Sequence, residues 1–342
     1  MRHALPLLAA LAIVACDGGP APKAEAAQPA ALPPPPEGPR LAFPLACRIG
    51  VDCEVQRYVD RDPGPGLLDY RCGRRTGEAH DGVDIRLVDM ALQARGVDVL
   101  AAAAGRVVAT RDGVEDVSVA KVGRAAVDAV ECGNRVAINH GDGWISDYCH
   151  MAKGSIRVKT GDVVAAGQPI GRVGLSGLTE FPHVHMSVRH NNVVVDPFAP
   201  GPVSPGACPA QAPLWTPQAA VAMTYKAGVI LNAGFAGEPV TMEAIEAGRV
   251  APFTAASPVV ATYLRALQLD RGDELELVLT GPGGARLAEY RSPPLDNDKA
   301  QQFNFIGKRR PPAGWPPGEY RAELRVHRGR KVVLQKTLST RI

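Results

Sequence analysis

Three short segments of the chain hold the residue types that can bind a metal ion. His183 and His185 lie two residues apart in an alternating run that predicts a strand, so both imidazoles should leave the same face. His80 and Asp84 lie four residues apart, a spacing that shares a face in a strand or a helix, and His150 ends a third predicted strand. A catalytic zinc ion takes three protein ligands and keeps a fourth position for water. His80, Asp84 and His185 can supply those three, which would leave His150 and His183 to handle protons.

The other polar residues near these segments have simpler interpretations. A histidine taken singly is more often a hydrogen-bonded polar residue than a metal ligand. We therefore expect hydrogen bonds to satisfy His140 and His190, which lie beside turns, and His327, on the polar face of a strand. We expect Asp81 to be solvated and Tyr148 to be a packing residue.

The elements that must position these residues are predicted to be strands. The sequence has 36 Gly, 31 Pro and only 5% aromatic residues, which favours short strands and turns over long helices. Residues 136–149 predict a hairpin with its turn at residues 141–143. Alternation along its second strand places Trp144, Ser146, Tyr148 and His150 on one face. Residues 112–129 have weak periodicity and predict an inserted loop or short helix.

The cysteines predict an oxidised, exported protein. Apart from Cys16 there are six, an even number that indicates three disulfides. Cys132 and Cys149 flank the predicted hairpin and should lie almost opposite each other. Residues 47–72 are expected to form a loop-like entrance flap, stapled by the cysteines at its two ends. No CxxC spacing occurs, so the thiols are not predicted to be metal ligands.

The N-terminus predicts an exported lipoprotein. Arg2 precedes an apolar run, residues 5–14, that is too short to span a bilayer as a mature helix. Residues 13–16, IVAC, resemble a bacterial lipobox, which implies cleavage before Cys16 and lipidation of its thiol. The alternative is an ordinary signal peptide with a chance cysteine. We expect a signal peptide at 1–16, a Pro/Ala-rich tether at 17–44, and a periplasmic lipoprotein of the cell envelope, anchored to the inner or outer membrane.

Taken together, the motifs resemble those of the lysostaphin-type zinc endopeptidases of the bacterial cell wall. HDGVD at 80–84, YCHM at 148–151 and PHVH at 182–185 occur in that order, with TGDVVAAGQPIG between the last two. The resemblance covers roughly residues 75–198 and implies an antiparallel β fold with the site in an open groove. It also implies one zinc ion held by His80, Asp84 and His185, with His150 and His183 as catalytic histidines that do not bind the metal. The implied reaction is hydrolysis of peptide bonds in peptidoglycan, and for a lipoprotein of a didermal bacterium we expect D,D-endopeptidase action on diaminopimelate-type stems.

This resemblance and the composition shifts predict the domain organisation. We expect an all-β chain with a barrel-sandwich-like peptidase domain at 45–202, a linker at 203–214 and a small β-sandwich accessory domain at 215–342. Leu275, Leu277 and Leu279 alternate with Glu274, Glu276 and Val278, as in a half-buried antiparallel sheet. The accessory domain is a candidate surface for a protein partner.

Two other classes of function remain as alternatives. The first is a non-enzymatic regulator of other cell-wall hydrolases, a class that resembles this fold but usually lacks the zinc ligands that are intact here. The second is a carrier module of the biotinyl or lipoyl type, suggested by the turns of residues 161–171. Such a module needs a lysine at a hairpin tip, which has no suitable equivalent here. A formal net charge of +3 with scattered basic residues does not indicate nucleic-acid binding.

Overall fold

The computed structural model describes Met1, residues 38–201, Cys208 and residues 212–342. The predicted signal peptide apart from Met1, including Cys16, and most of the predicted tether lie outside these described residues. Within the described part, no helix is both long and apolar enough to cross a membrane. By the clustering of contacts, residues 33–342 belong to one compact unit.

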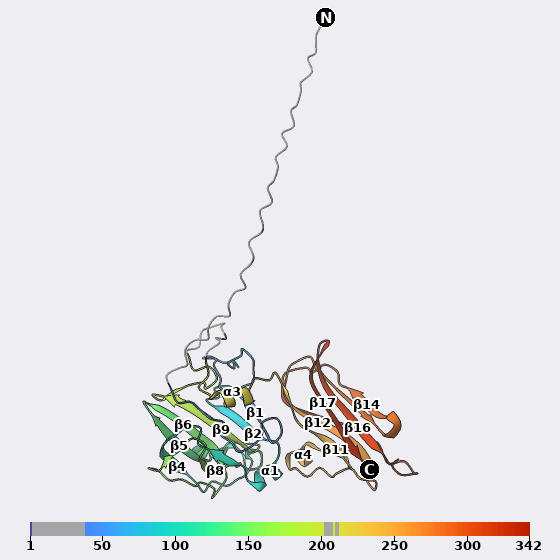
Figure 1. The fold of residues 1–342 in the computed structure, drawn as a ribbon, viewed down its shortest axis with the longest axis horizontal. Helices are drawn as coiled ribbons and strands as arrows, with labels where there is room; N and C mark the ends of the chain where they lie inside the picture. The colour runs from blue at the N-terminus through green and yellow to red at the C-terminus, as the bar shows by residue number, and fades with distance from the viewer. Residues whose placement is uncertain (2–37, 202–207, 209–211) are drawn as a thin grey trace. The chain divides into compact units, whose positions relative to one another are not determined.

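An antiparallel sheet carries four of the five predicted site residues. The fifth, His80, lies just before one of its strands. The order of the sheet is β1-β2-β9-β6-β5-β4-β7, with β10 paired to β9 (Figure 1). The strands are β1 (Cys53–Arg57), β2 (Val83–Leu87), β4 (Gly105–Arg111), β5 (Asn134–Gly141), β6 (Trp144–Met151), β7 (Val163–Val164), β9 (His183–His190) and β10 (Val193–Val194). A short pair, β3 (Asp98–Leu100) with β8 (Pro169–Arg172), and helix α1 (Met90–Arg95) complete this part.

The hairpin predicted for residues 136–149 is present as β5 and β6. Gly141 and Gly143 in its turn have φ angles of 93° and 80°, a region in which glycine carries no Cβ penalty. Strand β9 then pairs with β6 on one side and β2 on the other, so three segments distant in sequence become neighbours. This pairing brings the HDGVD and PHVH segments together.

The second part of the chain consists of two further antiparallel sheets. One contains β11 (Val229–Ala236), β12 (Val259–Leu269) and β15 (Lys299–Arg309). The other contains β14 (Arg286–Arg291), β13 (Asp273–Thr280), β16 (Glu319–Arg328) and β17 (Lys331–Arg341). Leu275, Leu277 and Leu279 on β13 are fully buried, as their alternation predicts. Helices α3 (Pro217–Ala222) and α4 (Met242–Glu246) are short, and the predicted all-β class with a small β-sandwich is confirmed.

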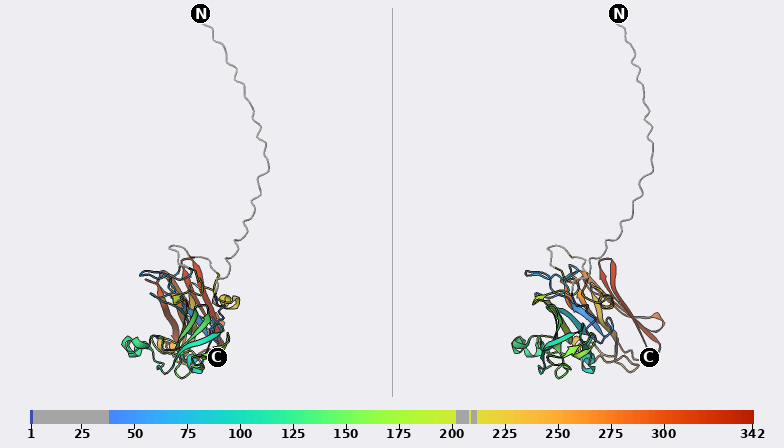
Figure 2. Two further views of the ribbon diagram at one scale, coloured as in Figure 1. Left: turned by 90° about the vertical axis from the view of Figure 1, so that its left-hand side faces the viewer. Right: turned by 60° about the vertical axis from the view of Figure 1, so that its left-hand side comes forward.

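The predicted insertion between β4 and β5 contains short helical turns. These are α2 (Val119–Val122) and the 3-10 turns Arg124–Ala126 and Asp128–Val130, which stand out from the strands in Figure 2. A disulfide joins Cys132, at the end of the insertion, to Cys149 on β6, as predicted. The insertion is therefore fastened to the sheet next to His150.

The entrance flap predicted for residues 47–72 is wrong in two respects. The segment contains β1, which pairs with β2 and contributes Cys53 and Val55 to the core. The disulfides join Cys47 to Cys53 and Cys72 to Cys208, so no bond links the two ends of the segment. Glu54 and Gln56 are buried along with Val55, so β1 is covered on both faces, although its residue types alternate between apolar and polar from Cys53 to Gln56.

The core of the first part extends beyond the sheet itself. Leu41 and Trp215 form a β-bridge, and both are fully buried in the same hydrophobic cluster as Val83 and Ile85 of β2. Met223, just after α3, belongs to this cluster as well. The domain limits at 45, 202 and 215 remain predictions, but this core draws on residues from both sides of them.

A buried group of charges connects β2 with the second part of the chain. Arg86 on β2 donates to both carboxylate oxygens of Glu246 at the end of α4, at 3.0 and 2.8 Å. Arg265 on β12 donates to the same carboxylate. The two arginine side chains are 1% and 0% exposed, whereas the Glu246 side chain is 24% exposed. Both cations therefore depend on one carboxylate for compensation.

Candidate metal centre

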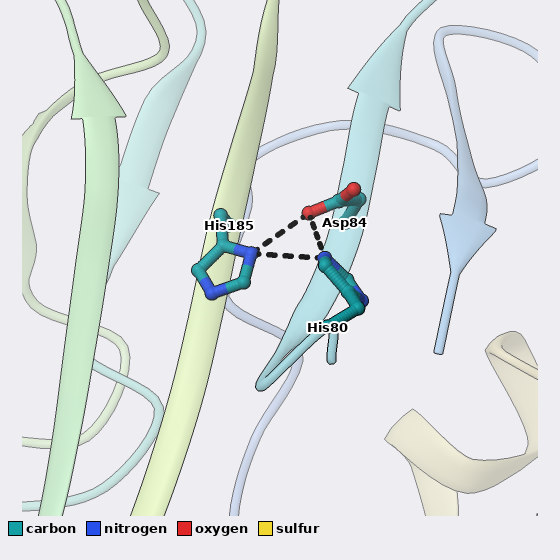
Figure 3. A group of neighbouring side chains, drawn as sticks. All are labelled: His80, Asp84 and His185. Atoms are coloured by element: carbon teal, nitrogen blue, oxygen red, sulfur yellow. Dashed lines mark hydrogen bonds and ion pairs between the residues drawn. The ribbon is translucent and has the colours of Figure 1, made fainter. Parts of the chain in front are cut away.

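Three side chains from two strands and a turn converge on one point. Asp84 on β2 lies directly opposite His185 on β9, and residues so paired project from the same face. His80 lies in the turn before β2. His80 Nε2 is 3.0 Å from Asp84 Oδ1, and His185 Nδ1 is 3.0 Å from that oxygen and 3.1 Å from His80 Nε2 (Figure 3).

The chemistry and spacing of these atoms fit a zinc ion. Two imidazole nitrogens and a carboxylate oxygen are a donor set that zinc accepts. Ligands at about 2 Å from a tetrahedral ion lie roughly 3.3 Å from one another, close to the separations seen here. A second group, Cys132, Asp147 and Cys149, has similar proximity, but its sulfurs are bonded to each other and offer no thiolate.

Hydrogen bonds fix the orientation of both imidazoles in this group. His80 Nδ1 donates to the backbone oxygen of Tyr58 at 2.8 Å, so its Nε2 carries the lone pair that faces the cluster. His185 Nε2 donates to Asp81 Oδ1 at 3.1 Å, and Asp81 Oδ2 accepts from Arg189 Nη2 at 2.6 Å. Asp81 is partly solvated, with 43% of its side chain exposed, but β9 also brings His185 and Arg189 to it from more than a hundred residues away, which the sequence did not predict.

The electrostatics of the cluster favour an ionised carboxylate beside a cation. Burial raises the pKa of Asp84, but the neighbouring His80 and His183 and the hydrogen bonds outweigh it and hold the pKa well below its usual value. Burial lowers the pKa of His185, yet its hydrogen bonds to Asp81 and Asp84 raise it to about 9. An ionised Asp84 carboxylate beside these imidazoles is compatible with a cation at the point where the three ligand atoms meet.

His150 and His183 lie beside this cluster. Their ring centroids are 4.6 Å apart, and His183 Nε2 lies 3.5 Å from Asp84 Oδ1. His150 Nδ1 donates to the backbone oxygen of Ser176 at 2.8 Å, and His183 Nδ1 donates to that of Phe181 at 3.0 Å. Burial, followed by the proximity of His183 and His185, holds the pKa of His150 well below its usual value. A neutral His150 therefore has an unprotonated Nε2.

The position of His150 differs from the alternation predicted for its strand. Tyr148 is fully buried in the core, as expected for a packing residue, whereas Asp147 and Cys149 line the groove. Strict alternation would therefore place His150 in the core with Tyr148. His150 instead has a φ of 60°, which turns its side chain into the groove beside His183. The shared face predicted for Trp144, Ser146, Tyr148 and His150 thus fails at its last member.

A groove with a volume of about 830 Å³ passes over the cluster. It is lined by all five predicted site residues, by Phe181 and by the insertion, which contributes Val119, Arg124, Glu131 and Cys132. The structure therefore brings together every residue that the motifs singled out. Their individual roles as ligands or proton carriers remain predictions.

The three remaining histidines among the described residues have the hydrogen-bonded surroundings expected of them. His140 lies 2.8 Å from both the Ala104 backbone oxygen and Ser146 Oγ. His327 Nε2 lies 2.8 Å from Glu276 Oε2. His190 contacts the Asp142 backbone oxygen at 3.1 Å.

Comparison with known proteins agrees with this geometry. Residues 78–197 match peptidase family M23. This segment of the chain is therefore similar to the M23 peptidases. The predicted resemblance to lysostaphin-type enzymes, placed at roughly 75–198, is thereby confirmed.

Individual relatives share only part of their length with this chain. The cell division protein DipM of Caulobacter vibrioides is 29% identical over 125 residues, which cover 36% of this chain and 17% of DipM. An uncharacterized metalloprotease of Buchnera aphidicola is 35% identical over 69 residues, which cover 20% of this chain and 18% of the relative. The catalytic domain of lysostaphin from Staphylococcus simulans is 25% identical, with 41% of this chain and 85% of that domain covered and a TM-score of 0.26. The chain thus spans less than a fifth of either curated relative.

Proposed function

We propose that the protein is a zinc-dependent endopeptidase that hydrolyses peptide cross-links in bacterial peptidoglycan. The observation that carries the proposal is the convergence of His80 Nε2, Asp84 Oδ1 and His185 Nδ1 within about 3 Å of one another, beside two imidazoles that are not in this set. The M23 domain assignment supports a peptidase. The intact donor set argues against a regulator without a metal.

The chemistry divides between the metal and the chain's own side chains. Zinc bound at this point would lower the pKa of a water molecule and polarise the scissile carbonyl. His150 and His183 both give their Nδ1–H to backbone carbonyls, so the Nε2 of each can accept a proton or return it to the leaving amine. One of the two would be the general base, and the other would position the substrate or stabilise developing charge.

The proposal extends to the substrate of the enzyme and its location in the cell. We propose D,D-endopeptidase action on diaminopimelate-type cross-links, by an enzyme held in the periplasm through lipidated Cys16. A tether over residues 17–44 would reach up to about 80 Å if extended as polyproline. The lipobox resemblance and the M23 domain support this assignment.

The test is mass spectrometry of purified peptidoglycan digested by the mature chain without its lipid. We expect cross-linked dimers to be converted to monomers, with loss of activity on chelation and recovery when zinc is restored. Release of intact cross-linked dimers as the only products would contradict the proposed bond. Zinc-loaded protein that cleaves nothing would favour the regulator instead.

A further inference from the structure

Four arginines line the groove, and three of them are paired within it. Arg124 pairs with Glu131, Arg135 with Asp147, and Arg189 with Asp81, at 3.0, 2.5 and 2.6 Å. The fourth, Arg57, forms neither a hydrogen bond nor an ion pair with any residue that the structure describes. Its Nε is buried and has no acceptor. Arg57 is therefore the cation of the groove whose charge no part of the described chain compensates.

Arg57 lies immediately beside the candidate metal centre. It is the last residue of β1 and is paired in register with Asp84 on β2, which is in turn paired with His185 on β9. The pairing shifts register between Val55 and Arg57, so the face is taken from the groove, whose lining includes Arg57, Asp84 and His185 together. The side chain of Arg57 thus leaves the sheet on the same side as the two ligands and one strand further out.

The turn that leads into His80 shows where the guanidinium lies. A Cβ atom built on Gly77 would lie 3.6 Å from Nη1 of Arg57 and 3.9 Å from Cβ of His80. The guanidinium is therefore held over this turn, half-buried and facing the groove. Glu78 also lines the groove, but it forms no ion pair with Arg57, and its exposed carboxylate accepts from the backbone N–H of Gly66.

We propose that Arg57 binds a free carboxylate of the substrate next to the scissile bond. A planar guanidinium matches a carboxylate through two parallel hydrogen bonds, and a partly desolvated, unpaired cation gains more from such a partner than an exposed one does. The inference rests on the proposed function, because diaminopimelate-type stems carry a free carboxylate on the residue that forms the cross-link. It makes Arg57 a specificity-determining residue for acidic peptides and predicts discrimination against the amidated form.

The test compares two stem peptides that differ only in this group, one with the carboxylate and one with a carboxamide. Binding is measured by fluorescence anisotropy to the zinc-loaded mature chain carrying His183→Ala, which slows cleavage. In that background we expect the carboxylate peptide to bind about 10- to 100-fold more tightly, the range of one charge-assisted pair. Arg57→Gln should remove the difference and Arg57→Lys should restore part of it. Arg330→Gln, at an exposed turn, should leave the difference intact.

Equal weakening of both peptides by Arg57→Gln would show a structural role and overturn the proposal, as would unchanged discrimination. Zinc content of each variant, measured in parallel, separates damage to the metal centre from loss of the contact. If the unmodified chain converts peptidoglycan dimers to monomers but discrimination does not depend on Arg57, the proposed function stands and this inference falls. If Arg57 selects the carboxylate peptide while the unmodified chain cleaves nothing, the binding site stands and the hydrolytic function falls.

Discussion

Replacing Asp81 with alanine should weaken zinc binding without removing a predicted ligand. The substitution takes away the acceptor of His185 Nε2–H and leaves Arg189 without its carboxylate. Loss of such a partner typically lowers metal affinity by about 10- to 100-fold, or about 1.4–2.7 kcal/mol. Because the Asp81 side chain is 43% exposed, water screens part of its effect. We therefore expect a rise in Kd of about 10- to 30-fold.

The assay is competition for zinc against a fluorescent chelator at neutral pH. Asp81→Asn keeps an oxygen acceptor without the charge and should fall between the alanine variant and the unmodified chain. Glu180→Ala is the matched control, since it removes an exposed carboxylate from the same groove. An unchanged zinc Kd in Asp81→Ala would refute the reasoning and show that β9 alone orients the His185 ring.

The remaining predictions concern the ligand assignment, the buried charges and the pH dependence of stability. His185→Ala should lose both zinc and peptidoglycan cleavage, whereas His183→Ala should keep zinc and lose cleavage; full zinc occupancy in the first variant would overturn the ligand assignment. Glu246→Gln leaves two buried arginines uncompensated, and with the 24% exposure of Glu246 discounted it should cost about 2–3 kcal/mol in urea unfolding. Exposed Glu243→Gln on the same helix is the control, and equal losses would contradict the argument. Burial lowers the pKa of His140 in the folded chain, so as the pH falls His140 is protonated in the unfolded chain before it is protonated in the folded one. The free energy of unfolding therefore decreases as the pH falls below about 6.5. His140→Gln should reduce the drop in urea midpoint between about pH 7.5 and pH 5.5, and an undiminished drop would exclude this cause.

Sequence patterns predicted the features whose signals are local. The spacing of His183 and His185 within a strand, and the hairpin between Cys132 and Cys149, each depend on a few consecutive residues. The order of the three motifs was enough to predict the family. The convergence of His80 and Asp84 with His185 then follows from the pairing of β2 with β9.

The features that sequence reasoning missed depend on contacts between distant segments. Asp81 has no local signal, because its partners lie on β9. Strand β1 was missed although its residue types alternate, because the Pro- and Gly-rich residues 62–66 indicated a loop for the whole segment, and Arg57 was missed along with it. The φ of 60° at His150 interrupts the alternation of side chains along β6. No neighbouring residue in the sequence marks this position.

The bridge between Leu41 and Trp215 has a consequence for the order in which the nascent chain can fold. Every predicted zinc ligand has been synthesised once His185 leaves the ribosome, but the core beneath the sheet still lacks Trp215 and Met223. Closing this core requires contacts across more than 170 residues, and the chain gains no burial energy from them until the later partners arrive. Nascent chains arrested before residue 223 should therefore be cut readily by protease and capture zinc weakly, while slightly longer chains resist. On this reasoning, the metal centre would form only after Trp215 and Met223, which lie outside it, have joined the core.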